Sequence, residues 1–415
     1  MPSNSKFSSL PFSPPPLYRG ITEWARTNLF SAWYNGVLTI VSALAVVLVL
    51  WFGLGWIFFK ADWTAVVTLG GRIIIGQYNI EAACPGQNCF WRPQVALLLV
   101  TTLLGMGWQI AGGGLTKRVA LIVGGMAALF AFLPYDLGRM GLDVRLLLVG
   151  NLPALGIGWM VARYTPLGTV SRVATSSLIA FALVLVLLRG VDGVPFLQPV
   201  SVIYWGGLML NLMLAIAGIG FSFPIGIALA LGRRSRLQGA RLLSIGFIEI
   251  FRGVPLITLL FMSQVLVPLA FPEDFPQNSL LRAGIVITLF SAAYMAENIR
   301  GGLQSLHPGQ SEAARALGLP GWQVMMFISL PQAIRNVIPA IVGQFISLFK
   351  DTTLVYIIGM LDVMEISRAF IQGNPEHLGS AKEIFVFLAA VFWVFTFGMS
   401  YISRRVEDHL GVGRR

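Results

Sequence analysis

Six ionisable residues in the second half of the chain lie within or at the edges of long apolar segments. They are Glu249, Arg252, Glu297, Arg300, Lys350 and Asp351. In a bilayer such groups cost about 2.5–3.5 kcal/mol each on insertion scales, and they mark substrate or ion pathways by default. Glu249 with Arg252, and Glu297 with Arg300, are spaced i, i+3, which sets each pair on one helix face. Each pair could therefore serve a pathway, or could be a structural ion pair that only steadies a helix bundle.

Other kinds of chemistry find no support in the residues. None of the five lysines follows a glycine, so the chain has no G-x-x-x-x-G-K-[ST] phosphate loop and cannot be an ATPase. The three histidines, His307, His377 and His409, are not spaced for metal binding. The G-x-S-x-G pattern of a hydrolase nucleophile is also missing from the sequence. We therefore expect no enzyme, no metal site and no cofactor bound by this chain itself.

The elements that would position the ionisable residues are membrane helices. Of the 415 residues 56% are hydrophobic and only 11% are charged, whereas soluble domains carry about 25% charged residues. We expect an all-α integral membrane protein with about ten spans, since a helix needs about 20 apolar residues to cross a bilayer. The predicted spans are 36–59, 95–114, 119–134, 146–162, 173–189, 203–231, 248–270, 282–300, 333–349 and 383–402.

The distribution of basic residues predicts the orientation. Residues 1–35 are polar and rich in proline, without the apolar core of a cleavable signal, and predict a cytoplasmic tail. With the N-terminus inside, the cytoplasmic segments hold 17 of the 29 Lys and Arg residues, in agreement with the positive-inside rule. Both termini, including a second tail at 403–415, are thus expected in the cytoplasm. The net charge of +11 then reflects basic loops rather than a nucleic-acid partner.

The membrane part divides into two regions of different character. Residues 36–195 carry almost no charge inside their spans, as expected of a structural extension. Residues 203–402 hold the ionisable groups described above. In the first long outer loop, "CPGQNC" places Cys84 and Cys89 on either side of a Pro-Gly turn signal, which favours a disulfide outside the inner membrane. Two free thiols are the alternative.

The segment 307–331 contains two helical patterns that are too short to cross a bilayer, separated by Gly318 and Pro320. Pro308 precedes the first piece and Gln310 or Ser311 is the candidate cap, so we expect Glu312 in the first turn, where an acidic residue suits the positive end of a helix. The second piece, "GWQVMMFISLP", is apolar and rich in methionine, so its surface needs a partner groove. A helix lying on lipid would carry more basic residues than the single Arg315, and we prefer a protein partner.

Here the residues carry a resemblance. The stretch "EAARALGLPGWQVMMFISLPQAIRNVIPAIVGQFISLFKDTTL" resembles the EAA loop and following span of permease subunits of ATP-binding cassette (ABC) importers, in particular the polar amino-acid group. "GLMLNLMLAIAGIGFSFPIGIALALGRRS", "FIEIFRGVPLITLLF" and "AAYMAENIRGGLQSLHPGQ" resemble the preceding spans, in the same order. The match covers about 203–402. The long N-terminal extension resembles the permeases of general L-amino-acid import systems, nearer their M-type chain.

The resemblance implies a type I importer core of five helices, with loop 307–331 docking on an ATPase dimer that binds ATP and magnesium. Glu312, Ala313, Ala314 and Gly318 match the coupling motif. The other implied partners are a second, homologous permease and a periplasmic amino-acid-binding protein that docks on outer loops such as 60–94, 190–202 and 271–281. Location in a bacterial inner membrane follows.

An amino-acid substrate would need a partner for each of its two charges. Glu249 or Glu297 could serve its ammonium group, and Arg252 or Arg300 its carboxylate. Asp351, Thr352 and Thr353 are further candidates for the path. The competing reading is a secondary transporter or channel acting alone, which would leave the coupling motif unexplained; an enzyme embedded in the membrane is the third.

Overall fold

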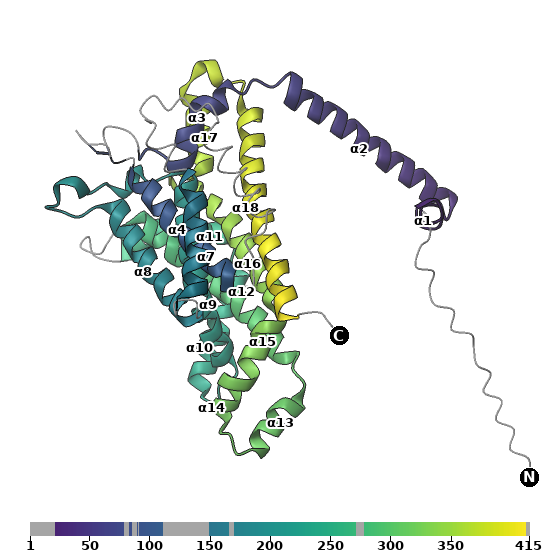
Figure 1. The fold of residues 1–415 in the computed structure, drawn as a ribbon, viewed down its shortest axis with the longest axis vertical. Coiled ribbons are helices and arrows are strands. Elements are labelled where there is room, and N and C mark those ends of the chain that lie inside the picture. The colour runs from purple at the N-terminus through teal and green to yellow at the C-terminus, as the bar shows by residue number, and fades with distance from the viewer. Residues whose placement is uncertain are drawn as a thin grey trace, which may run out of the picture. The chain divides into compact units, whose positions relative to one another are not determined.

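The computed structural model describes residues 21–78, 83–84, 89, 91–110, 149–165, 170–270 and 278–411. These residues form helices and no strands, with only two isolated β-bridges (Figure 1). Six of their helices are long and apolar enough to cross a membrane, or seven if a bent pair counts as one span. The predicted all-α membrane class is confirmed. The chain divides into two compact units, Met1–Asp62 and Trp63–Arg415.

The described part of the first unit contains helices α1 (Ile21–Asn28) and α2 (Trp33–Phe59). None of the residues of α2 is buried. A helix that is apolar on every side belongs in a hydrophobic environment, and α2 coincides with the first predicted span. The short amphipathic helix α1 falls within the segment expected to be a polar tail. The Thr39 hydroxyl of α2 donates to the Leu29 carbonyl just after α1 (3.0 Å).

The second unit begins with the described helices of the N-terminal extension: α3 (Thr64–Ile75), α4 (Trp91–Ile110), α7 (Asn151–Tyr164) and α8 (Val170–Arg189). A Cβ atom on Gly105 of α4 or Gly158 of α7 would collide with the backbone of the other helix. Small residues therefore set the close packing of this pair. The predicted span 119–134 lies outside the described residues.

The core region contains α9 (Gly207–Arg233), α10 (Gln238–Gly253), α11 (Leu256–Ala270), α12 (Ser279–Gln304), α16 (Ile338–Asp351) and α18 (Ala381–Leu410). Helices α9 and α12 pack closely, because Gly226 on α9 leaves room for the Met295 side chain of α12. Around this contact a cluster of buried apolar side chains includes Ala230, Ile248 and Ile299. Helices α9 and α12 form the centre of the core region.

The remaining helices of the described residues are short. The α-helices among them are α13 (Pro308–Ala316), α14 (Gly321–Gln323), α15 (Leu330–Asn336) and α17 (Val363–Gly373). A π-helix, η4, spans Val324–Ser329. The 3₁₀ helices are η2 (Pro195–Leu197), η3 (Val202–Tyr204), η5 (Thr352–Ile358) and η6 (Pro375–His377). In Figure 1, α3 and α17 lie at one end of the second unit, and α13 and α14 lie at the other.

Two of the predicted spans are not single straight helices. The span 248–270 is the bent pair α10 and α11, with an angle of 103° between them. The cause is Pro255, which lacks a backbone N–H and pushes Val254 into an extended conformation (φ −108°, ψ 133°). The span 333–349 is likewise interrupted at Val337, two residues before Pro339.

A cluster of buried polar groups joins parts of the extension to one another and to the connection that leads to α9. The fully buried Arg92 donates to the carbonyls of Gln198 (2.8 Å) and Phe196 (3.1 Å) in the connection to α9. The Tyr78 hydroxyl donates to the Leu188 carbonyl (2.6 Å), and burial raises the pKa of Tyr78 to about 12, so it remains a donor. The structure also contains the disulfide between Cys84 and Cys89, both buried in the same cluster.

A second buried network lies at the start of α17. Asp362 is fully buried, and its side chain caps the helix by accepting from the Glu365 N–H (2.9 Å). Asn211 of α9 donates to the Asp362 carboxylate (3.5 Å) and to the Thr352 hydroxyl (3.1 Å), and its own oxygen accepts from the Val363 N–H (3.1 Å). Burial raises the pKa of Asp362 from 3.8 to about 6, despite these hydrogen bonds.

This shift gives a pH-dependent stability that can be tested. Because the folded pKa of Asp362 is raised, the folded state holds its proton more tightly, and stability is lost as pH rises from about 4 through about 6. The difference amounts to about 3 kcal/mol at most. We expect Asp362→Asn, which keeps a capping oxygen without the charge, to raise the melting temperature at pH 8 and to leave it unchanged at pH 4. Equal effects at both pH values would contradict this account.

Candidate functional site: the loop 307–331 and a neighbouring charge cluster

The loop 307–331 folds as the two short pieces expected from its sequence. His307, rather than the predicted Gln310 or Ser311, caps α13: its Nδ1 accepts from the Gly309 N–H (3.1 Å), and Pro308 begins the helix. The helix thus starts earlier than predicted, and Glu312 does not lie in its first turn. Helix α14 then runs into the π-helix η4, where the Leu330 N–H bonds five residues back to the Met325 carbonyl. The loop thus connects α12 directly to α15 and α16.

Gly318 makes the turn between the two pieces. Its φ is 82°, in the left-handed region that favours glycine. The Gly318 N–H donates to the Arg315 carbonyl (2.9 Å), and the Leu319 N–H donates to the Ala314 carbonyl (3.3 Å). This pair of bonds is the Schellman motif, which satisfies the last carbonyls of α13 and fixes the direction of the chain after it.

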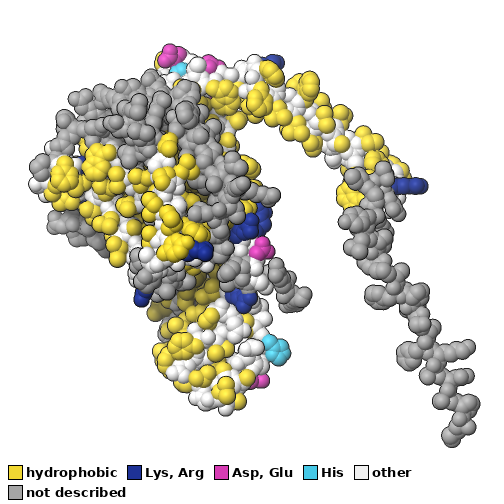
Figure 2. Space-filling view, viewed as in Figure 1, with side chains coloured by type: hydrophobic (Ala, Val, Ile, Leu, Met, Phe, Trp, Pro, Cys, Tyr) yellow, Lys and Arg dark blue, Asp and Glu magenta, His cyan; other side chains and the backbone are white. Residues whose placement is uncertain are grey.

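The surface of the loop is apolar and open. Among its exposed large side chains are Leu317, Trp322, Met326 and Phe327, and hydrophobic atoms cover much of this part of the second unit in Figure 2. Glu312 and Ala313 are exposed, but Ala314 is buried within the chain. Of the four predicted motif residues, Ala314 therefore serves internal packing in this structure, while the other three are accessible.

Near the C-terminal end of α12, which leads into the loop, the Glu297 carboxylate contacts three arginines from three helices. Its carboxylate accepts from Arg233 of α9 (2.7 Å) and from Arg300 of α12 (3.0 Å), and Arg252 of α10 lies 3.6 Å away. The Glu297 side chain is 15% exposed, and the three arginines are 27–36% exposed. Three guanidinium groups around one half-buried carboxylate form a strong link between the ends of α9, α10 and α12.

The predicted pairs are only partly present. Glu297 and Arg300 pair as expected, with a second contact at 2.9 Å. Glu249 does not pair with Arg252: it lies 3.5 Å from Arg233, and Arg252 faces Glu297 and the Tyr294 ring. Helix α10 packs against both α9 and α12, and this packing brings Glu249 to Arg233 and Arg252 to Glu297. In the sequence Arg233 is one of several basic residues that follow a span, so its place in this cluster was not predicted.

Asp351, Thr352 and Thr353 lie at the other end of α16, away from the charge cluster. Thr352 is fully buried, and its hydroxyl donates to the Phe349 carbonyl (2.7 Å) as well as accepting from Asn211. The Thr353 hydroxyl donates to the Lys350 carbonyl (2.8 Å). The candidate path residues therefore form two separate groups, and Thr352 is engaged in a structural network.

Two further predictions concern metal and docking loops. Within the described residues, no group of three or more His, Cys, Asp or Glu side chains could hold a metal ion. Of the outer loops named as docking candidates, 271–277 lies outside the described residues, as do 79–82, 85–88 and 90.

Comparison with known proteins identifies the family. Residues 222–411 match the binding-protein-dependent transport system inner membrane component. The inner membrane amino-acid ABC transporter permease protein YhdY of Escherichia coli is 35% identical over 392 residues, which cover 94% of this chain and 93% of YhdY. The chain belongs to this permease family. It is a multi-pass membrane permease of the bacterial inner membrane, and the family predicted from the four ordered motifs is confirmed.

Two classes of relatives differ in how much of this permease they cover. The glutamate/glutamine/aspartate/asparagine transport system permease protein BztC of Rhodobacter capsulatus is 32% identical and covers 94% of both chains. The glutamate/aspartate import permease protein GltK of Escherichia coli is also 32% identical, but it matches only 48% of this chain with 91% of its own. A crystal structure of an amino acid ABC transporter with histidines aligns over 49% of the permease, with 28% identity and a TM-score of 0.44.

Proposed function

We propose that the chain is one permease subunit of an ATP-driven importer that carries L-amino acids from the periplasm to the cytoplasm. The observation that carries this proposal is the exposed two-piece loop 307–331, which follows α12 directly in the chain of a permease-family member. Its apolar surface is small, shaped by a fixed turn, and accessible to a partner. The names of YhdY and BztC support amino acids as the substrate class.

The loop would act as the coupling helix. An ATPase dimer, which supplies the sites for ATP and magnesium, would receive Glu312, Ala313 and the apolar side chains around Gly318 in a surface groove. Because α13 is joined to α12 through His307, and η4 to α16 through α15, a displacement of the loop must move both spans. Glu297 passes the movement of α12 on to α9 and α10 through Arg233 and Arg252. ATP-driven closure would thereby change the side from which the permease is open.

The substrate path would use ionisable side chains that are not fully engaged with each other. Glu297 and Arg300 bind each other and are therefore largely satisfied. Glu249, whose side chain is 60% exposed, and Arg252, whose contact with Glu297 is long, keep capacity for the ammonium and carboxylate groups of an amino acid. Asp351 and Thr353 would line a second part of the path at the opposite end of α16.

The assembly would contain a second, homologous permease chain and a periplasmic amino-acid-binding protein, with both termini of this chain in the cytoplasm. This chain would be the M-type member of the pair. The extension 36–195 would brace the core region, and the packing of α3 against α9 and the contact of Arg92 with the connection before α9 support that role.

The experiment that tests the proposal is a pull-down of the chain from its native membrane in mild detergent, with mass spectrometry of every co-purifying protein. We expect an ATPase with a phosphate loop and a second permease of the same family. Reproducible isolation of a lone polypeptide would leave the loop without a partner and would favour an autonomous transporter.

A further inference from the structure

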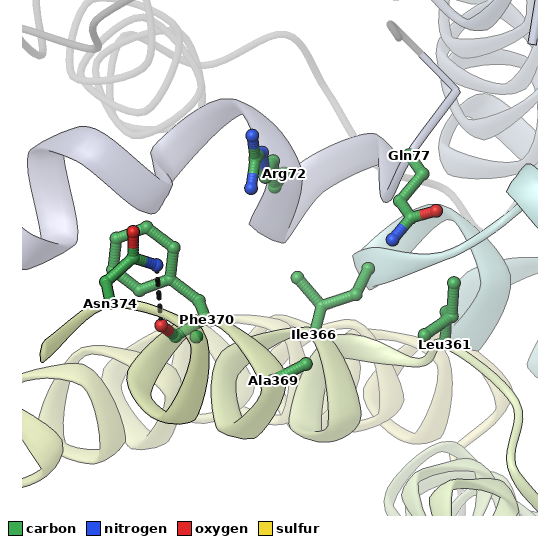
Figure 3. A pocket seen from close by; sticks show the side chains of 8 residues that line it. Arg72, Gln77, Leu361, Ile366, Ala369, Phe370 and Asn374 are labelled. Atoms are coloured by element: carbon green, nitrogen blue, oxygen red, sulfur yellow. Dashed lines mark hydrogen bonds between the residues drawn. The ribbon is translucent and has the colours of Figure 1, made fainter. Parts of the chain in front are cut away.

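A groove of about 300 Å³ lies between α3 of the extension and α17 of the core region (Figure 3). Arg72 and Gln77 line it from the side of α3, and Ile366, Phe370 and Asn374 line it from α17. Figure 3 shows the two groups of side chains facing each other across the opening. The groove is near the lower limit of volume for sites that bind small groups.

The topology places this groove at the end of the permease opposite to the coupling loop. Helix α17 connects the end of α16 to the start of α18, whereas the loop 307–331 connects the end of α12 to α15 and the start of α16. The two features lie at opposite ends of the second unit in Figure 1. If the loop faces the cytoplasm, as proposed above, the groove faces the periplasm.

The polar groups of the groove have unused hydrogen-bonding capacity. Arg72 is exposed, and in the described part of the chain neither its guanidinium group nor the Gln77 amide has a hydrogen-bond or ion-pair partner. The Asn374 amide donates to the Phe370 carbonyl (2.7 Å), which holds it at the rim. The floor beneath is apolar, because Ile366 and Phe370 are 5% and 7% exposed. A guanidinium group above an apolar floor suits a carboxylate carried on a short aliphatic stem.

The charge of the groove selects between possible carboxylates. Aspartate and glutamate are absent from its lining residues, and Glu365 on α17 pairs with Arg368 (3.7 Å). A free amino acid would bring an ammonium group for which the groove offers no anion. An Asp or Glu side chain of a protein carries a carboxylate without an ammonium group. We propose that the groove receives an Asp or Glu side chain of the periplasmic binding protein, an inference that rests on the proposed function.

The position of α3 adds a restriction to this docking contact. Helix α3 lies outside residues 222–411, which match the family, whereas α17 lies inside them. YhdY and BztC cover 94% of the chain, but relatives such as GltK cover 48%. The groove therefore requires α3 of the extension, and it gives the extension of this chain a direct part in recognising the binding protein.

The test uses the complete complex in nanodiscs and the purified binding protein loaded with its substrate. The dissociation constant is measured for wild type, Arg72→Gln, Arg72→Lys and Lys382→Gln, at low and at moderate salt. Lys382 is the control, an exposed basic residue at the start of α18 that does not line the groove and lies outside the named docking loops. We expect Arg72→Gln to weaken binding about tenfold at low salt, Arg72→Lys to keep most of the affinity, and Lys382→Gln to have no effect. The difference between wild type and Arg72→Gln should shrink as salt rises, because salt screens exposed charges.

Each other outcome overturns a defined part of the account. Unchanged affinity of Arg72→Gln would reject the docking groove while leaving the importer intact, and would be the result if Arg72 binds a lipid phosphate instead. Equal weakening by Lys382→Gln would mean a general effect of positive charge and would also reject the groove. Failure of the binding protein to bind the wild-type complex would reject the proposed function together with this inference.

Discussion

Replacing Gly318 with valine is expected to lower ATP-driven uptake by about tenfold, while the complex still inserts and assembles. Gly318 has a φ of 82°, which costs a residue with a side chain about 1–2 kcal/mol. No atom lies within 4 Å of the position that its Cβ would take, so the effect is one of backbone conformation and not of collision. A conformational cost of this size lowers the population of the native turn, relative to other conformations, by about tenfold. The exposed surface of the loop then has a different orientation in most molecules. Uptake is measured in proteoliposomes with a matched amount of assembled complex.

Two control variants make this prediction specific. Gly318→Asn should keep most of the uptake, because asparagine tolerates the left-handed conformation. Gly321→Val, in open space with an ordinary backbone, should also retain it.

Glu312→Lys changes the exposed charge of the loop without changing its backbone, and it should abolish uptake. Full activity of Gly318→Val and Glu312→Lys would mean that the loop does not couple the permease to an ATPase.

The second large effect is expected at Glu297. Glu297→Gln leaves Arg233, Arg252 and Arg300 without their shared anion at a half-buried site, and mutual repulsion replaces attraction. We expect a loss of about 1–3 kcal/mol of stability, a lower melting temperature of the solubilised complex, and impaired uptake. Glu249→Gln is the matched control. Glu249 is 60% exposed and has only a 3.5 Å contact, so its loss should change stability by about 0.5 kcal/mol or less.

A double-variant cycle separates the network from a general role of Glu297. In wild type, Arg252→Gln removes a partner of the carboxylate. In the Glu297→Gln background the same change removes a repelling charge, and it should therefore destabilise less or even stabilise. Additive effects of the two substitutions would show that Glu297 and Arg252 act independently, which the arrangement of α10 against α12 argues against.

The features that the sequence predicted well are local or repetitive. Long apolar runs predicted α2, α9 and α12, and the turn at Gly318 followed from a glycine between two short helical patterns. The four ordered motifs predicted the family. Each of these depends on residues that are close together in the sequence, or on a pattern that one short window contains.

The features that were missed depend on contacts between distant segments. Arg233 reads as an ordinary basic residue after a span, and only the packing of α9 against α10 and α12 brings it to Glu249 and Glu297. Pro255 within an apolar run signals a possible break, but the 103° angle depends on what α10 packs against. Thr352 was a candidate for the substrate path, yet it bonds to Asn211 across 141 positions of sequence.

The measurement that tests the central claim most directly is amino-acid uptake into proteoliposomes that contain the purified complex. Binding protein and labelled amino acid are supplied outside, and ATP is enclosed inside. The account predicts accumulation that requires both ATP and the binding protein, and that is lost in Gly318→Val but retained in Gly321→Val. Accumulation without nucleotide, driven by an imposed ion gradient, would contradict it.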